Sequence, residues 1–267
     1  MAIDTNFNLN PYYDDYNENK NFLRILFKPG FAVQARELTQ VQSIFQKQVE
    51  RMGEAAYRNG TVVTGAETFA QEATYIKLNS TYAGLDLVAN NFIGQSILST
   101  DDSKRAEVVK VYEADPGTGD PITLMVKQLY GEPFVATETI KTNEASPYFA
   151  DISPSVTAVG TGQLFSVTEG VFYYEGFFIK NAAQTIATSK YTTTLSNVRI
   201  GFEVSESIVT SDSDTTLLDP AQDASNYQAP GADRYKIDLI LATRSLASID
   251  TTKFIELRRI EQGESTR

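Results

Sequence analysis

The sequence contains no cysteine and no histidine among its 267 residues, and these two absences exclude most kinds of catalytic or metal site. Without cysteine there can be no disulfide bond and no thiolate ligand for a metal ion. Without histidine the chain lacks the commonest general base and the commonest metal ligand, which excludes Ser-His-Asp and Cys-His catalytic groups and ordinary zinc sites. An enzyme would have to use carboxylates, lysine or tyrosine alone. We therefore predict a non-enzymatic protein with no cofactor and no metal ion.

Long apolar stretches are missing as well. No run reaches the roughly 18 residues needed to span a bilayer. Residues 1–20 are polar and acidic, and they lack the basic and apolar regions of a signal peptide. The net charge of −11 argues against a groove that binds nucleic acid. We expect synthesis in the cytoplasm, and neither a membrane nor a nucleic acid as partner.

One long helix is predicted near the N-terminus, over residues 32–58, with Asn59-Gly60 as its C-terminal signal. At ~1.5 Å per residue it would be about 40 Å long. Its apolar residues recur at spacings of three and four, so they share one face. These residues are Leu38, Val41, Phe45, Val49, Met52 and Ala56.

The rest of this helix is rich in glutamine, and Gln48 falls where a strict heptad would place an apolar residue. A polar residue at one core position of a coiled coil can fix the register and the oligomeric state. Two interpretations stay open at this point. Either the helix lies on a sheet of its own chain with Gln48 at the rim, or it lines an oligomer interface. The second interpretation assigns to the interface Leu38, Val41, Phe45, Gln48 and Met52.

From residue 61 onward the sequence is strand-like, because short runs rich in β-branched and aromatic residues alternate with turn residues. Residues 106–114 and 122–130 are predicted to form a hairpin around a Gly- and Pro-rich loop, and Glu175-Gly176 a two-residue turn between aromatic strands. Residues 131–160 are expected to be loops. The predicted fold is mainly β (α+β), with one long N-terminal helix followed by antiparallel sheets of sandwich or barrel type.

Three regions follow from this pattern. Residues 1–60 would form an N-terminal arm and the long helix. Residues 61–160 would form a β-rich domain with a hairpin subdomain at about 92–130. Residues 161–267 would form a second β-rich part, which is expected to continue into a longer chain.

Two aromatic segments are candidates for contact with other subunits. Tyr12, Tyr13 and Tyr16 lie in the N-terminal arm, which either docks on a neighbour or stays a solvated terminus. Asn226 and Tyr227 lie in a long polar loop, residues 212–234, which either docks on a neighbour or stays fixed on its own protomer.

The remaining charged clusters indicate no site. Asp14-Asp15 and Asp101-Asp102 are carboxylate pairs, but both lie in polar stretches and are interpreted as solvated charges. The acidic loops 115–120 and 212–219 do not match the twelve-residue calcium-loop pattern. Arg24, Lys28 and Arg36 surround the start of the helix, and we expect them to form salt bridges on the helix.

Two longer stretches, residues 11–63 and residues 217–241, carry a resemblance, together with the aromatic hairpin GVFYYEGFFI between them. In this order they resemble a family of virion structural proteins of large contractile-tailed phages, including those of cyanobacteria. The resemblance implies a tail-fibre or baseplate protein with no known catalytic residue. It favours the N-terminal anchoring region of a homotrimeric tail fibre, joined to the baseplate. A baseplate wedge or collar protein is the alternative. A glycan-degrading tail enzyme is a third, but it would need two facing acids that the sequence does not offer.

Overall fold

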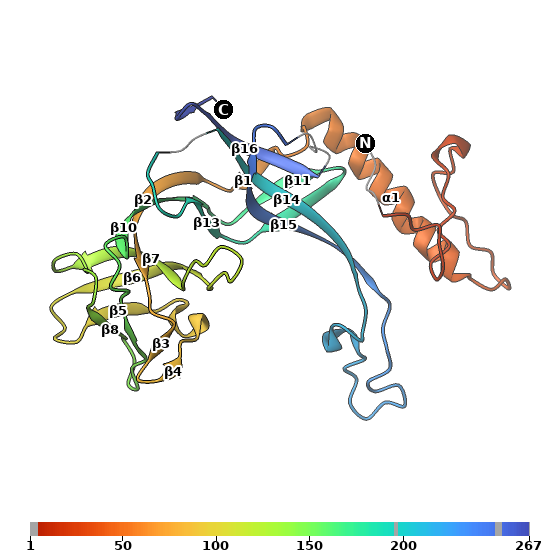
Figure 1. Ribbon diagram of the computed structural model, residues 1–267. Helices are drawn as coiled ribbons and strands as arrows, with labels where there is room; N and C mark the ends of the chain where they lie inside the picture. Colours follow the sequence, from red (N-terminus) through yellow and green to blue (C-terminus); the bar gives the residue numbers. More distant parts are fainter. Residues whose placement is uncertain (1–4, 195–196, 249–252, 267) are drawn as a thin grey trace.

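A computed structural model describes residues 5–194, 197–248 and 253–266 (Figure 1). The protein is mainly β, with one N-terminal α-helix followed by antiparallel sheets, as the sequence predicted. The helix, α1, spans Ala35–Ala56, and a 3-10 turn, η1, at Glu18–Lys20 precedes it. Within the described residues, no helix combines the length and the apolar character needed to cross a membrane.

An eight-stranded sheet in the order β13-β10-β2-β7-β6-β5-β8-β9 forms the first β-layer. Its strands are β2 (Thr68–Lys77), β5 (Ser96–Ser99), β6 (Arg105–Tyr112), β7 (Thr123–Tyr130), β8 (Thr139–Thr142), β9 (Phe149–Asp151), β10 (Val159–Val167) and β13 (Gln184–Ser189). The small hairpin of β3 (Thr81–Tyr82) and β4 (Leu85–Asp86) and the 3-10 turn η2 (Ala89–Phe92) join it. Ile76, Phe92 and Leu124 are fully buried in the core of this part.

Two smaller sheets pack face to face and give the second core, a sandwich. One has the order β1-β11-β12 and the other β15-β14-β16-β17. Their strands are β1 (Val62–Gly65), β11 (Gly170–Tyr174), β12 (Phe177–Asn181), β14 (Val198–Val209), β15 (Arg234–Ser245), β16 (Phe254–Glu261) and β17 (Glu264–Ser265). The rings of Phe172 and Phe202 meet edge to face across the sandwich, with centroids 5.0 Å apart. Such contacts add to the area that both rings remove from water.

A long antiparallel ribbon of β2 and β10 connects the two cores. The strands pair in unbroken register from Val159 opposite Ile76 to Val167 opposite Thr68. One end of the ribbon contributes Ile76 to the first core, and the other end contributes Phe165 and Val167 to the second. The two β-rich parts therefore share one sheet, and the expected boundary between residues 160 and 161 falls inside β10.

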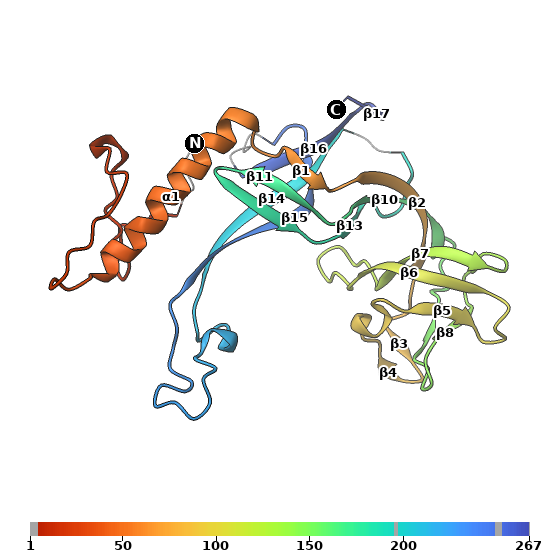
Figure 2. The same cartoon turned by 180° about the vertical axis from the view of Figure 1, so that it is seen from behind.

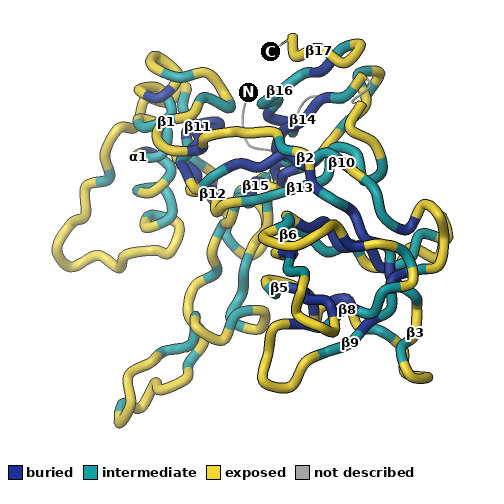
Figure 3. The backbone as a smooth tube through the Cα atoms, turned by 90° about the vertical axis from the view of Figure 1, so that its left-hand side faces the viewer, coloured by how far each residue is buried: buried dark blue, intermediate teal, exposed yellow. Residues whose placement is uncertain are grey.

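The strands β14 and β15 form a hairpin that extends far beyond the sandwich. They pair from Val198 opposite Ser245 to Val209 opposite Arg234. Beyond that pair, a loop with the 3-10 turn η3 (Thr215–Leu217) projects away from both cores (Figures 1 and 2). The helix α1 lies on one side of this hairpin, and β3 to β9 lie on the other. Buried residues concentrate in the sheets, whereas α1 and the N-terminal arm are mostly exposed or half-buried (Figure 3).

The structure confirms some of the local predictions and contradicts others. The helix is shorter at both ends than residues 32–58, because Gln34 is extended and caps the first turn and Tyr57 is extended after the last. The hairpin of β6 and β7 is confirmed. The turn at Glu175-Gly176 is also confirmed, with φ of 44° and 88°, which suits a two-residue hairpin. The expectation of loops throughout residues 131–160 is wrong, because β8 and β9 pair there and bury Ile140 and Ala150.

The strand β7 offers a test of the first core within a single element. Leu124 is fully buried, whereas Leu129 is 49% exposed. We expect Leu124→Ala to lower the free energy of unfolding by about 2–5 kcal/mol, because it leaves a cavity. We expect Leu129→Ala to change it by no more than ~0.5 kcal/mol. Chemical denaturation followed by circular dichroism measures both, and equal losses would contradict the burial of Leu124.

Candidate functional site

The start of α1 is fixed by its own sequence. The backbone N–H of Gln34 precedes the first turn and donates to the Glu37 carboxylate at 3.0 Å. This bond satisfies an amide that the helix itself cannot pair, and the negative charge of Glu37 suits the positive end of the helix dipole. The helix is 22 residues long, about 33 Å at ~1.5 Å per residue.

A close contact between Gly53 of α1 and Tyr173 of β11 sets how the helix lies on the sandwich. A Cβ atom at Gly53 would stand 2.3 Å from the Tyr173 ring, so no larger residue fits without a shift. The Tyr173 hydroxyl donates to the carbonyl of Glu50 at 3.2 Å. The Tyr173 ring itself is fully buried, and burial raises the pKa of its hydroxyl. The helix thus approaches the sheet closely through its smallest residue.

Polar bonds complete the same contact at the turn between β11 and β12. The Gln46 side chain donates to the carbonyl of Gly176 at 2.7 Å. The Asn59 side chain accepts from the backbone N–H of Glu175 at 2.8 Å. The face of α1 that meets the sandwich is therefore small and polar.

As a consequence, the apolar face of α1 points away from the sheets. Leu38, Phe45 and Met52, spaced seven residues apart, are 56%, 68% and 69% exposed. Val41 and Val49 lie between them and are half-buried. The helix thus lies on a sheet of its own chain, but it does so through Gly53 and Gln46 and not through its apolar face. We call the residues Leu38, Val41, Phe45, Val49 and Met52 the apolar seam; Gln48 is exposed and flanks it.

A third side of α1 is covered by the N-terminal arm through charged and polar bonds. Asp15 pairs with Arg36 at 3.3 Å. Glu18 pairs with Arg51 and also with Lys47, at 3.2 Å for the latter. Ile44, between Arg36 and Lys47 along α1, is buried. These ion pairs are exposed, so each contributes modestly and together they fix the direction of the arm.

The beginning of the arm is bound to the long β14–β15 hairpin. Both the N–H and the hydroxyl of Thr5 donate to the Glu206 carboxylate, at 3.1 and 2.6 Å. The Tyr12 hydroxyl donates to Asp233 at 2.6 Å. The rings of Phe7 and Tyr235 meet edge to face, with centroids 5.0 Å apart. The arm therefore bridges α1 and the hairpin.

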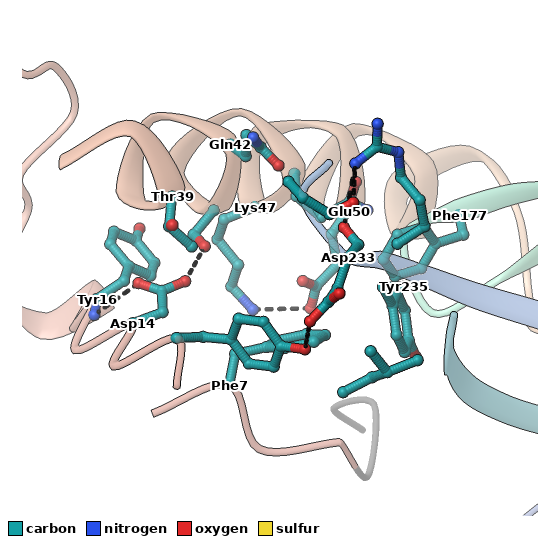
Figure 4. A pocket seen from close by; sticks show the side chains of 16 residues that line it. Phe7, Asp14, Tyr16, Thr39, Gln42, Lys47, Glu50, Phe177, Asp233 and Tyr235 are labelled. Carbon is teal, nitrogen blue, oxygen red and sulfur yellow. Dashed lines mark hydrogen bonds and ion pairs between the residues drawn. The ribbon is translucent and has the colours of Figure 1, made fainter. Parts of the chain in front are cut away.

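Between arm, helix and hairpin lies a cleft of about 810 Å³ (Figure 4). Its aromatic walls include Phe7, Phe177 and Tyr235, and its charged groups include Asp14, Lys47 and Glu50. Desolvation lowers the pKa of Lys47, but hydrogen bonds to Glu50 and Glu18 outweigh this effect and leave the pKa raised. Tyr12 has a raised pKa, mainly because its hydroxyl donates to Asp233. The cleft therefore combines aromatic walls with charged groups of both signs.

The carboxylate pairs noted in the sequence do not face each other. Asp14 accepts from Ser43, whereas Asp15 pairs with Arg36. Asp101 accepts from the hydroxyls of Ser99 and Ser103, which lower its pKa to about 2, and it stays ionised. Among the residues that the structure describes, no three carboxylates lie together as metal ligands would.

The predicted docking residues occupy different surroundings. Tyr12 is engaged with its own hairpin, Tyr16 lines the cleft, and Tyr13 is 57% exposed. Asn226 donates to Asp219 within its own loop, whereas Tyr227 is 46% exposed. That these five residues contact an adjacent subunit stays a prediction.

The comparison with known families gives one match. A family model described as a domain of unknown function (DUF4815) matches residues 10–103 and 155–265. The chain belongs to this family. The DUF4815 match includes the arm from residue 10 onward, α1, the sandwich and all the residues that line the cleft except Phe7. It leaves out residues 104–154, which contain β6 to β9. No curated protein and no solved structure matches the chain.

A second polar cluster, outside the cleft, escaped the sequence analysis. Asp120 accepts from the Tyr191 hydroxyl at 2.6 Å and pairs with Lys190 at 3.2 Å. The ammonium of Lys77 lies over the Tyr191 ring, 3.8 Å from its centroid. Burial, and then the hydrogen bond to Asp120, raises the pKa of Tyr191 to about 12. The cluster holds the loop between β6 and β7 against the strands β2 and β13.

Gly53 is the other residue that the sequence analysis missed. A glycine inside a helical pattern costs about 1 kcal/mol relative to alanine and usually has a packing reason. That signal, together with the aromatic run at residues 172–174, could have indicated the contact.

Replacing Gly53 tests the contact that orients α1. We expect Gly53→Ala to lower the free energy of unfolding by ~1–3 kcal/mol through overpacking against Tyr173, despite the better helix propensity of alanine. Glu54→Ala, at the next, exposed position, is the control and should change it by no more than ~0.5 kcal/mol. Thermal unfolding compares the two. A Gly53→Ala variant more stable than the wild type would contradict the contact.

Titration of Tyr191 makes part of the stability depend on alkaline pH. The pKa of its hydroxyl rises from 10.0 to about 12 on folding, so the folded state holds this proton more tightly. The contribution is complete below pH 10 and is lost as the pH rises through about 12. We expect the midpoint of urea unfolding to fall less steeply over this range in Tyr191→Phe than in the wild type. Tyr227→Phe, in the projecting loop, should behave like the wild type.

Proposed function

We propose that this DUF4815 chain is a structural, non-enzymatic component of a tailed-phage virion: the N-terminal anchoring region of a tail fibre that joins it to the baseplate. The chain would be made in the host cytoplasm and incorporated into the virion tail, where it would act in host attachment. In this proposal it works as a homotrimer, in contact with other tail and baseplate proteins.

The observation that carries the proposal is the exposed apolar seam of α1. A seam of large apolar side chains at heptad spacing is the pattern by which helices of separate subunits pack together. Leaving Phe45 and Met52 more than two-thirds exposed is unfavourable in water, at ~25 cal/mol for each Å² of apolar surface. Three copies of α1 around one axis would bury these side chains, with Gln48 at the flank available to select the register.

The bonding within the cleft also supports a structural role. Glu50 pairs with Lys47 at 2.7 Å, and Asp233 accepts from Tyr12 at 2.6 Å. The first pair lies within α1, and the second ties the arm to the start of β15.

The resemblance in sequence supplies the virion context. It rests on residues 11–63, which hold most of the arm and all of α1, and on residues 217–241, which hold most of the projecting loop and two thirds of β15. These parts carry the whole seam and most of the residues that line the cleft. A fibre root must resist load through wide contacts between subunits, and exposed seams of this kind suit that task.

The oligomeric state tests the proposal. Native mass spectrometry of the wild type should give three times the chain mass of 29.5 kDa. The double variant Phe45→Asp/Met52→Asp should be monomeric, because it places charges in the seam. We expect the dissociation constant to rise by on the order of 100-fold, as loss of ~2–3 kcal/mol at an interface hot spot implies.

The control is Leu85→Asp, because Leu85 is 74% exposed on the small β3–β4 hairpin far from α1. It should stay trimeric. The seam variants should keep the wild-type circular dichroism, since the side chains are exposed in the single chain. A wild type that is monomeric at high concentration would favour a baseplate wedge or collar protein whose symmetry is imposed by its neighbours. A seam variant that still forms trimers would show that the apolar seam is not part of the interface.

A further inference from the structure

The segment between the 3-10 turn η1 and α1, residues 22–33, exposes more large apolar side chains than any other stretch of similar length among the described residues. The exposed fractions are 65% for Phe22, 61% for Leu23, 75% for Leu26, 50% for Phe27, 74% for Phe31 and 52% for Val33. At about 150–250 Å² per aromatic side chain, the three phenylalanines alone expose on the order of 400 Å². The largest apolar patch of a typical monomer is ~300–600 Å² in total, and such patches usually mark an interaction site.

Apart from that of Phe31, the backbone N–H groups of this segment also lack hydrogen-bond acceptors in the described part of the chain. Among the described residues, no backbone N–H from Phe22 to Gly30 donates a hydrogen bond, and the bond from Phe31 to the carbonyl of Lys28 is local. The residues 22–27, FLRILF, favour extended structure. An extended, apolar and unpaired segment is a ready partner for another chain.

The charges of the segment have no acidic partner within the described residues, although the Lys28 ammonium lies 5.8 Å from the centroid of the Phe31 ring. Arg24 and Lys28 form no ion pair within the described residues, although we expected both to do so; Arg36 alone confirms that prediction. The segment contains no acidic residue, while the whole chain carries a net charge of −11. Its positive charge therefore favours contact with an acidic surface such as that of another copy.

We propose that residues 22–33 of one copy occupy the cleft between α1 and the β14–β15 hairpin of a second copy. The aromatic walls of the cleft, formed by Phe7, Phe177 and Tyr235, would cover the leucines and phenylalanines. Asp14, Glu50 and Asp233 would face Arg24 and Lys28. This arrangement rests on the proposed function insofar as copies of this chain must assemble, but it uses a surface separate from the apolar seam.

This exchange, in which the segment of each copy enters the cleft of another copy, has a consequence for symmetry. Each copy carries both the segment and the cleft, and they are different surfaces, so the contact is head to tail. Such a contact closes into a ring when the rotation between copies allows it, and a three-fold ring would fill every cleft.

Cross-linking tests the exchange directly, because the natural chain has no cysteine and every introduced thiol is unambiguous. Leu26→Cys is placed in one copy and Ala232→Cys, which lines the cleft, in another. The two proteins are mixed, oxidised and separated under denaturing, non-reducing conditions. We expect a disulfide-linked dimer, and on the order of tenfold less of it when Leu85→Cys replaces Leu26→Cys. Arg24→Glu/Lys28→Glu in the Leu26→Cys copy should slow the cross-link several-fold, because charge steers the encounter.

The other outcomes overturn the inference in distinguishable ways. A wild-type trimer without a specific cross-link would reject the exchange and leave the proposed function standing. A cross-link found only within one chain, when both cysteines are in the same copy, would show that the segment folds back into its own cleft. A wild type that stays monomeric and gives no cross-link would reject both proposals.

Discussion

The contact of Gly53 with Tyr173 is the constraint on which the arrangement of the N-terminal third depends. Because no Cβ atom stands at this position, the helix can approach β11 until the Tyr173 hydroxyl reaches the Glu50 carbonyl. This close approach fixes the rotation of α1 about its axis. Gln46 and Asn59 bind the neighbouring turn and hold the helix in this orientation. The outward direction of Leu38, Phe45 and Met52 follows from these contacts.

The N-terminal arm depends on the same orientation. Its acidic residues pair with Arg36, Lys47 and Arg51, which all lie along the side of α1 opposite the apolar seam. Thr5 and Tyr12 bind the arm to the β14–β15 hairpin. If the helix were rotated, these basic groups would no longer meet the arm, and the cleft between arm and hairpin would lose one wall. The Gly53–Tyr173 contact and several weak polar bonds thus determine where the apolar seam, the arm and the cleft lie.

The sequence predicted those features that depend on local patterns. The spacing of Leu38, Val41 and Phe45 was sufficient to place them on one helical face, because the period of a helix is fixed. Glu175-Gly176 was sufficient to predict the turn, because the residue types match the backbone angles it needs. The direction of the helical face was beyond prediction, because it depends on Gly53 meeting a tyrosine 120 residues further along the chain. The strands β8 and β9 were missed because they are short and lie among serine, asparagine and proline residues, so their pairing depends on neighbouring strands.

The ribbon of β2 and β10 determines how the protein would carry a mechanical load. Its two antiparallel strands run without interruption from one core to the other. Because each strand passes from one core to the other, a force that pulls the cores apart along the ribbon is carried by two covalent backbones in parallel, and the hydrogen bonds between them keep the strands in register. Two cores joined in this way would respond to tension as a single stiff body.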